Sequence, residues 1–438
     1  ETTEINPNLV EVTLTATGEN DEETRATFSG YPKIAWEGNE EISLLGANTG
    51  NQKLTANGKG HQTTFTGYAD VTDETYYAVY PYDANVSLTA DGKLSNVTLP
   101  AIQTATAGSF DPKAYIAVAK STDKESLYFK AVGAFVKFKL EDAENVKSVT
   151  MVSNSGANMA CSATVVMNEN GGVSHGSPYV DGTASSSVKM VGDFQTDKAY
   201  FMVVRPQPYT GGVTFYIEYK DGTVLSRTGA SALFESGKAR NYIRNFNVLR
   251  KADFKPVSDL YSLYTMGYDV TVGDMTINKE THSAKLITAS EANTSLYNQF
   301  NNGGIYFLAV SGEGSFNLHS NVTAKQSVVL IGNASDGKIS IDVNGKNINH
   351  AAGTIALKNI ELKTGSNTNY VFANNNATAD VDNFVTVNSA FMGSSLIGDI
   401  YTGRLARNYN ELMNTTSAFI RYTNDISDNP LTWFATWL

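Results

Sequence analysis

Side chains that could bind a metal or act as nucleophiles are spread thinly along this chain of 438 residues. No two of the five histidines have the spacing of a metal-binding pair, and the single cysteine, Cys161, has no cysteine partner. The sequence also lacks a Gly-x-Ser-x-Gly nucleophile elbow, a glycine-rich phosphate loop and a dinucleotide fingerprint. We therefore predict no metal, no cofactor and no enzymatic activity, and we expect Cys161 to be a buried, inert thiol.

The acids that could support catalysis lie toward the C-terminal end of the chain, at Asp342, Asp380, Asp382 and Asp399. Cleavage of a polysaccharide needs clustered carboxylates, either as paired acids or as calcium ligands. Asp380 and Asp382 would share one face of a strand, although the segment 379–383 also has the composition of a solvated corner. A surface carbohydrate-active enzyme, similar to polysaccharide lyases and hydrolases, is therefore an alternative interpretation.

The same region could instead bind a sugar without cleaving it. Amide groups pair with sugar hydroxyls, and aromatic rings offer a flat apolar face. One stretch combines both types, and its candidate ligand-binding residues are Tyr370, Phe372, Asn374 and Asn376. The alternative is structural, because asparagines also stack in internal ladders at the turns of a solenoid.

A single basic residue stands at the end of an acidic loop near the N-terminus. Alternation of apolar and polar residues predicts a half-buried first strand, whose inward residues are Val10, Val12, Leu14 and Ala16. The acidic stretch 18–23 follows, and then Thr24–Phe28 opens a second strand. An arginine-specific protease could cut between Arg25 and Ala26, unless Arg25 is an ordinary exposed arginine. A sheet that loses a strand has a groove, which another chain can fill by β-strand addition.

Short strands separated by turn residues dominate the chain as far as residue 250. Apolar or alternating runs predict strands at 42–45, 75–80, 115–119, 135–140, 146–152, 199–204, 213–219 and 242–248. Pairs such as Asp91-Gly92 and Asp221-Gly222 supply the positive φ angles of tight hairpins. This pattern predicts β-sandwiches, with boundaries near 130–133 and 250–256.

The last part of the chain has a different pattern. Apolar residues at helical spacing predict a helix at Ser290–Asn302, with Ser290 as its N-cap and Gly303-Gly304 as its end. Short apolar runs closed by Asn or Gly follow, and 355–360 and 385–390 look like one unit repeated about 30 residues apart. We predict a small right-handed parallel β-helix-like domain, with the helix as one cap and Trp433, Phe434 and Trp437 in the other. A third sandwich is the alternative.

Composition and charge narrow the class of protein. Charged residues are 18% of the chain and the net charge is −11, which argues against nucleic-acid binding. No apolar run approaches the roughly 20 residues of a membrane-spanning helix. The chain starts at Glu1 without a methionine, so we expect that processing removes a targeting segment.

In its first 250 residues the chain resembles the fimbrillins, the major and minor fimbrial subunit superfamily of Bacteroidales. The motifs that carry the resemblance are Thr24–Phe28, Ile34–Asn39, Tyr80–Asp83, Leu99–Gln103, Gly108–Pro112 and Phe129–Ala134. The resemblance implies an all-β fold with two transthyretin-like β-sandwich domains, at 1–131 and 132–252. The predicted β-helix-like domain then occupies 253–438.

The resemblance also implies a function. Fimbrillins are exported to the cell surface as lipoprotein precursors of the outer membrane, with the lipid on a cysteine, and they are cut after an Arg or Lys near the end of the first strand, the place that Arg25 holds. The emptied groove accepts a donor strand from another fimbrial subunit. Shaft subunits end in a strand that they donate, whereas a long segment of different character stands here. We therefore predict a tip adhesin that binds a glycan or a surface protein, with a non-polymerising anchor lipoprotein as the alternative.

Overall fold

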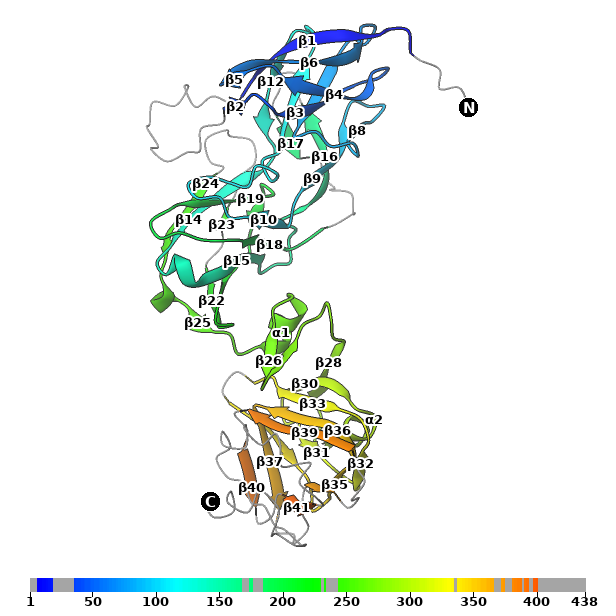
Figure 1. Ribbon diagram of the computed structural model, residues 1–438, viewed down its shortest axis with the longest axis vertical. Helices are drawn as coiled ribbons and strands as arrows, with labels where there is room; N and C mark the ends of the chain where they lie inside the picture. The colour runs from blue at the N-terminus through cyan, green and yellow to red at the C-terminus, as the bar shows by residue number, and fades with distance from the viewer. Residues whose placement is uncertain are drawn as a thin grey trace. The chain divides into compact units, whose positions relative to one another are not determined.

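A computed structural model describes residues 6–18, 35–167, 173–175, 184–229, 232–233, 243–334, 337–365, 372–374, 380–387, 390–393 and 397–400. The regular structure in these residues is almost all β-strand, and the chain forms two compact units, Glu1–Pro256 and Val257–Leu438 (Figure 1). No helix within these ranges is long and apolar enough to cross a membrane.

The first unit begins with an eight-stranded sheet whose strands are not in chain order. Their spatial order is β12 (Ser126–Tyr128), β1 (Leu9–Thr17), β6 (Gln62–Asp70), β4 (Gly50–Ala56), β3 (Glu41–Gly46), β7 (Tyr76–Tyr80), β11 (Ala117–Ser121) and β13 (Lys130–Ala131). Neighbours are antiparallel except for β1 and β12, which are parallel. Alternate side chains face a core that contains Leu44, Phe65 and Val118. A short pair, β2 (Trp36–Glu37) and β5 (Lys59–Gly60), adds Trp36 to this core.

This sheet closes on itself through one short segment. Its two edge strands, β12 and β13, are consecutive in the chain and separated by Phe129 alone. The Phe129 N–H donates to the Thr17 carbonyl at 2.9 Å, and the Val132 N–H donates to the Ile116 carbonyl at 2.9 Å. The segment therefore bonds β1 on one side and the start of β11 on the other. We call this closing segment, from β12 to β13, the joint of the sheet, and β1 pairs directly with it.

Further sheets in the described residues join strands from distant parts of the first unit. A four-stranded sheet has the order β17 (Val173–His175), β16 (Cys161–Met167), β9 (Leu94–Leu99), β8 (Ser87–Leu88). A six-stranded sheet has the order β10 (Ile102–Thr104), β18 (Ser187–Val191), β15 (Val146–Ser153), β21 (Val213–Tyr219), β22 (Val224–Thr228), β25 (Lys255–Pro256). A three-stranded sheet has the order β19 (Tyr200–Val204), β14 (Ala134–Leu140), β24 (Ile243–Leu249), and β20 (Pro208–Tyr209) pairs with β23 (Ala232–Leu233).

A second core, around Phe138, Met151 and Ile217, is built from side chains of the six- and three-stranded sheets. Two 3-10 turns, Ala143–Asn145 and Lys251–Asp253, complete the regular structure of this unit. The ladders β9–β16 and β10–β18 pair strands from both sides of residue 131. The division into 1–131 and 132–252 therefore stays a prediction.

The second unit is a solenoid of parallel strands with three faces. The first face consists of β28 (Ala284–Ala289), β30 (Gly304–Val310), β33 (Val328–Gly332), β36 (Ala352–Lys358) and β39 (Asp380–Val387). The second consists of β29 (Thr294–Ser295), β31 (Phe316–Asn317), β34 (Ile339–Asp342), β37 (Ile360–Gly365) and β40 (Ala390–Gly393), and the third of β32 (Val322–Ala324), β35 (Ile348–His350), β38 (Phe372–Asn374) and β41 (Ile397–Ile400). The predicted β-helix-like architecture is confirmed.

Stacking of equivalent residues fills the interior of the solenoid. Val328 pairs with Ile355 and Leu330 with Leu357 on successive coils, and these four side chains are completely buried. Each coil spans roughly 25 residues. Because each coil buries its inward side chains on its neighbours, the core is a continuous column.

A helix replaces the third-face strand in the first coil. Helix α2 (Tyr297–Asn302) packs on β32 and β33, buries Phe300 and ends at Gly303, whose φ is +69°. It is shorter than the predicted helix at 290–302. Ser290 is not the N-cap, because Thr294–Ser295 form β29 and pair with the next coil. Inter-coil pairing overrides the helical spacing of the sequence here.

The predicted repeat also needs a correction of register. The segments at 355 and 385 are neighbours on the first face, but Ile355 pairs with Phe384 rather than with Val385. Between Val381 and Asn383 the ladder to β36 shifts by one residue, so Asp382 is the extra residue of a bulge. The predicted cap residues Trp433, Phe434 and Trp437 lie outside the described residues.

The outer side of the first face is covered by helix α1 (Leu260–Thr265) and the hairpin of β26 (Val270–Val272) and β27 (Met275–Ile277). The rings of Tyr261 and Tyr264 lie 5.3 and 5.4 Å from that of Phe307. Lys358 Nζ donates to the Thr271 carbonyl at 2.6 Å. The cover buries Phe307 completely.

Candidate functional site

The first strand lies at the joint of the closed sheet and is the strand that the sequence singles out for removal. β1 forms an unbroken antiparallel ladder with β6, from Leu9 opposite Asp70 to Thr17 opposite Gln62. On its other side only Thr15–Thr17 pair with β12 within the described residues. The Thr15 N–H donates to the Glu125 carbonyl at 2.8 Å. Loss of β1 would therefore open the sheet between β6 and β12.

The inward side chains of β1 are not equally buried. Leu14 and Ala16 are 1% and 0% exposed, Val12 is partly buried against the core, and Val10 is 40% exposed. The period-two pattern is present along the whole strand, but the core lies only under its C-terminal half. Most of the apolar burial that holds β1 in the sheet therefore comes from Leu14 and Ala16.

An aromatic cluster supplied by other strands begins at the cross-strand neighbour of Leu14. Leu14 pairs with Phe65 on β6, and the Phe65 ring meets the Trp36 ring edge-on at 5.0 Å. Trp36 also contacts Tyr80 at 5.3 Å and Phe129 at 5.5 Å. Trp36 is 4% exposed, so it is a core residue rather than a ligand contact. This cluster does not include a β1 side chain.

The N-terminal end of β1 is held by polar contacts instead. Asn6 Nδ2 donates to Asp70 Oδ2 at 2.7 Å, and the Val71 N–H donates to the Asn8 carbonyl at 3.3 Å. Asp70 Oδ1 accepts from the Thr72 N–H and hydroxyl. Hydrogen bonds from the Thr72 side chain and then from Asn6 lower the pKa of Asp70.

The predicted cleavage site lies outside the described residues. Arg25 and Ala26 fall in the segment 19–34, which follows β1 directly. The last contact before it is a hydrogen bond from the Gly18 N–H to the His61 carbonyl at 3.1 Å.

The candidate ligand-binding stretch of the second unit is described in part. Phe372 and Asn374 lie in β38 on the third face, where Phe372 pairs with Ile348 and Asn374 with Ile400. Tyr370 and Asn376 lie outside the described residues. Asp380 and Asp382 belong to β39 on the first face and Asp399 to β41 on the third. The solenoid thus places Asp380 and Asp382 on one face and Asp399 on another.

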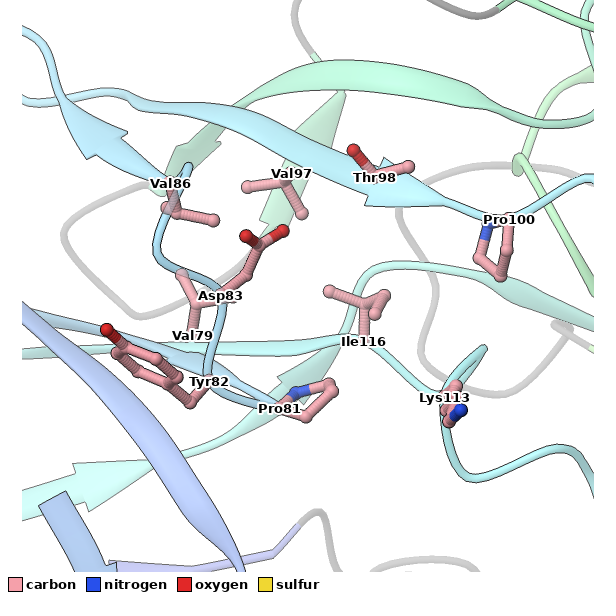
Figure 2. Close-up of a pocket in the computed structure, with 10 residues that line it drawn as sticks. All are labelled: Val79, Pro81, Tyr82, Asp83, Val86, Val97, Thr98, Pro100, Lys113 and Ile116. Carbon is pink, nitrogen blue, oxygen red and sulfur yellow. The ribbon is translucent and has the colours of Figure 1, made fainter. Parts of the chain in front are cut away.

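One cavity of about 230 Å³ in the first unit was not expected from the sequence (Figure 2). Its apolar wall includes Val79, Val86, Val97 and Ile116, and its polar groups are those of Tyr82, Asp83, Thr98 and Lys113. Asp83 Oδ1 accepts from the backbone and side chain of Asn85. The motifs at 80–83 and 99–103 both contribute to this cavity. They are far apart in the sequence, so no local pattern predicts that they meet.

Metal-ligating groups do not gather in the part of the chain that the structure describes. It contains no group of three or more His, Cys, Asp or Glu side chains that could hold a metal ion. Cys161 is 1% exposed, and burial raises the pKa of its thiol to about 11. The prediction of a buried thiol is confirmed.

Comparison with known proteins finds similarity only among solved structures. No protein-family model and no curated protein matches the chain. A candidate cell adhesion protein from Bacteroides ovatus is 13% identical over 57% of this chain and 96% of its own, with a TM-score of 0.34. Another from Bacteroides uniformis is 17% identical over 56% and 95%, with a TM-score of 0.34. A fimbrial assembly protein from Parabacteroides distasonis is 10% identical over 57% and 94%, with a TM-score of 0.25.

Proposed function

We propose that this chain is a fimbrial subunit whose first strand is exchanged for a strand of another subunit after cleavage between Arg25 and Ala26. The observation that carries the proposal is the place of β1 at the joint of a closed sheet. Without β1, backbone groups of β6 and β12 lose their partners, and the space of Leu14 and Ala16 is empty. Both losses are unfavourable, and a replacing strand reverses them.

The role we favour is that of a tip adhesin at the cell surface, exported as a lipoprotein precursor of the outer membrane. The second unit is compact by itself, and the strands that the structure describes in it form a solenoid. Such a unit is suited to contact a glycan or a surface protein. Tyr370, Phe372, Asn374 and Asn376 are the candidate contact residues.

Limited digestion of the folded chain with an arginine-specific protease tests the first step. Intact mass should show a single early cut after Arg25, and the variant Arg25→Lys, which keeps the charge, should resist it. The cut protein is then incubated with a synthetic C-terminal strand from a fimbrial shaft subunit. We expect the peptide to replace residues 1–25 in a stable complex. Protection of Arg25 in the folded chain, or retention of the first strand against excess peptide, would contradict the proposal.

A glycan array probed with the full chain tests the second step. We expect selective binding that Asn374→Ala weakens, while Asn301→Ala, an exposed asparagine on α2, leaves binding unchanged. Turnover of a bound polysaccharide would instead favour an enzyme.

A further inference from the structure

The two halves of β1 are held by different kinds of contact. Its C-terminal half has ladder neighbours on both sides and two buried side chains. Within the described residues, Leu9–Thr13 have β6 as their one ladder neighbour, and Val10 is 40% exposed. A strand held on one side, with little apolar burial, opens most easily. The N-terminal half of β1 would therefore fray first if the ladder were its only support.

A polar contact lies where that support is weakest. Asn6, three residues before β1, donates its side-chain amide to Asp70 Oδ2 at 2.7 Å. Its side-chain oxygen accepts from the Asn8 N–H at 3.0 Å, and its carbonyl accepts from the Leu9 N–H at 3.2 Å. One residue thus connects the start of β1 to the end of β6.

The carboxylate that receives Asn6 is fixed from several directions. Asp70 is 2% exposed, and Thr72 occupies its other oxygen through a backbone and a side-chain hydrogen bond. The Asp70 N–H donates to Thr49 Oγ1 at 2.9 Å, and that hydroxyl donates to Asp73 Oδ2 at 2.6 Å. Because none of these contacts involves β1, the acceptor stays in position when the strand moves. A preorganised ionised acceptor makes a stronger hydrogen bond than a mobile neutral one.

We propose that Asn6 and Asp70 form a latch that retains the first strand in its groove after the chain has been cut, so that β1 leaves slowly unless another strand displaces it. This inference rests on the proposed function, since a latch on β1 matters for assembly only if β1 is exchanged. Asn6 and Asp70 are positioning residues here. They set how long the cut subunit stays closed, and they protect the exposed backbone of β6 from unspecific pairing.

Hydrogen exchange on the uncut chain tests the latch without any cleavage. In Asn6→Ala we expect the amides of Leu9–Thr13 to exchange about tenfold faster, since the hydrogen bond to the ionised Asp70 is lost together with the longer one to the Asn48 carbonyl and the one from the Asn8 N–H. The amides of Thr15–Thr17 should stay as they are. The matched control is Asn8→Ala, because Asn8 is exposed and contacts Val71 through its backbone carbonyl. Equal exchange in Asn6→Ala and Asn8→Ala would overturn the latch.

Release of the cut strand, without added peptide, is the second arm. A fluorophore on the first strand should leave the cut Asn6→Ala protein about tenfold faster than the cut wild type. Asp70→Asn should act in the same direction, and if it fails to fold, the Asn6 variants still decide the question. Faster exchange in Asn6→Ala together with a strand that no peptide displaces would support the latch and contradict the proposed function. If the peptide displaced β1 normally but Asn6→Ala released the cut strand at the wild-type rate, the proposed function would be supported and the latch contradicted.

Discussion

Cys161 is a thiol that burial keeps protonated. Its pKa rises from 9.0 to about 11 in the folded chain, and only the thiolate reacts with alkylating agents. We therefore expect iodoacetamide at pH 8 to modify the folded protein about 100-fold more slowly than the urea-unfolded protein, as measured by intact mass. Similar rates in both states would mean that β16 opens readily.

Glu218 is a buried carboxylate with two lysines and a serine as partners. It is 4% exposed, and its oxygens accept from Lys147 at 2.8 Å, Ser148 at 2.7 Å and Lys189 at 3.4 Å. Burial acts to raise the pKa of Glu218, but these hydrogen bonds and the lysine charges outweigh burial, so the net pKa is lowered. A carboxyl with a lowered pKa stabilises the fold above its unfolded pKa and ceases to do so as the pH falls through its folded pKa.

Glu218→Gln should therefore lower the free energy of unfolding by about 1–2 kcal/mol at pH 7. The effect is no larger because solvent screens the exposed charge of Lys147. Urea unfolding at pH 7 and pH 3 measures this. The difference from wild type should shrink once the pH is below the ordinary value of 4.5. The exposed Glu144 supplies the control Glu144→Gln, which should change neither value. A difference that is as large at pH 3 would refute the electrostatic explanation.

At the scale of elements, the buried side chains that hold β1 in its sheet lie in its C-terminal half. Leu14→Ala removes a side chain that is 1% exposed, whereas Val10→Ala removes one that is 40% exposed. We expect Leu14→Ala to destabilise the first unit by about 2–5 kcal/mol, and Val10→Ala by well under about 1 kcal/mol. Chemical unfolding of the two variants makes the comparison. Equal effects would mean that the core extends under the whole strand.

Helix α2 closes the first coil through one side chain. Phe300 is completely buried in the core of the solenoid, so Phe300→Ala should destabilise the second unit by about 3–5 kcal/mol. The exposed Asn301 on the same helix gives the control Asn301→Ala. If Phe300→Ala and Asn301→Ala lowered the free energy of unfolding equally, helix α2 would not contribute to the core of the solenoid.

Some elements could be predicted from the sequence because their pattern is local. The alternation at 135–140 and 213–219 belongs to strands with one buried face, and both are present as β14 and β21. β9 lacks a strict period of two, because Asn96, with a φ of +62°, shifts its ladder with β16, so that Leu94 and Val97 both face the core at a spacing of three. β29 was mistaken for helix because its partner is the next coil. A single-segment pattern does not contain that information.

At the scale of the whole molecule, the chain has two compact units whose cores differ in construction. The sandwich cores belong to Glu1–Pro256 and the solenoid core to Val257–Leu438. We therefore expect calorimetry to resolve two transitions. Leu14→Ala should shift one of them and Phe300→Ala the other, with additive effects in the double variant. A single transition that both substitutions shift would contradict this independence.

The candidate site shows where sequence reasoning stops at this scale. The stripe of Val10, Val12, Leu14 and Ala16 is visible as a pattern, but its place at the joint depends on β12 and β13, which lie more than a hundred residues away. The contact between Asn6 and Asp70 joins residues that are 64 positions apart and polar, so no local pattern marks it. Closure and latching are properties of topology, which local periodicity does not encode.

The stacked coils of the second unit have a consequence for how such proteins diversify. Each inward residue rests on an equivalent residue one coil away, as Leu330 rests on Leu357. A duplication or deletion of one whole coil therefore preserves every kind of contact in the column and changes its height by about 4.8 Å. The height of the column can thus change in discrete steps without a change in the residues at its corners, so column height and corner sequence can be inherited separately.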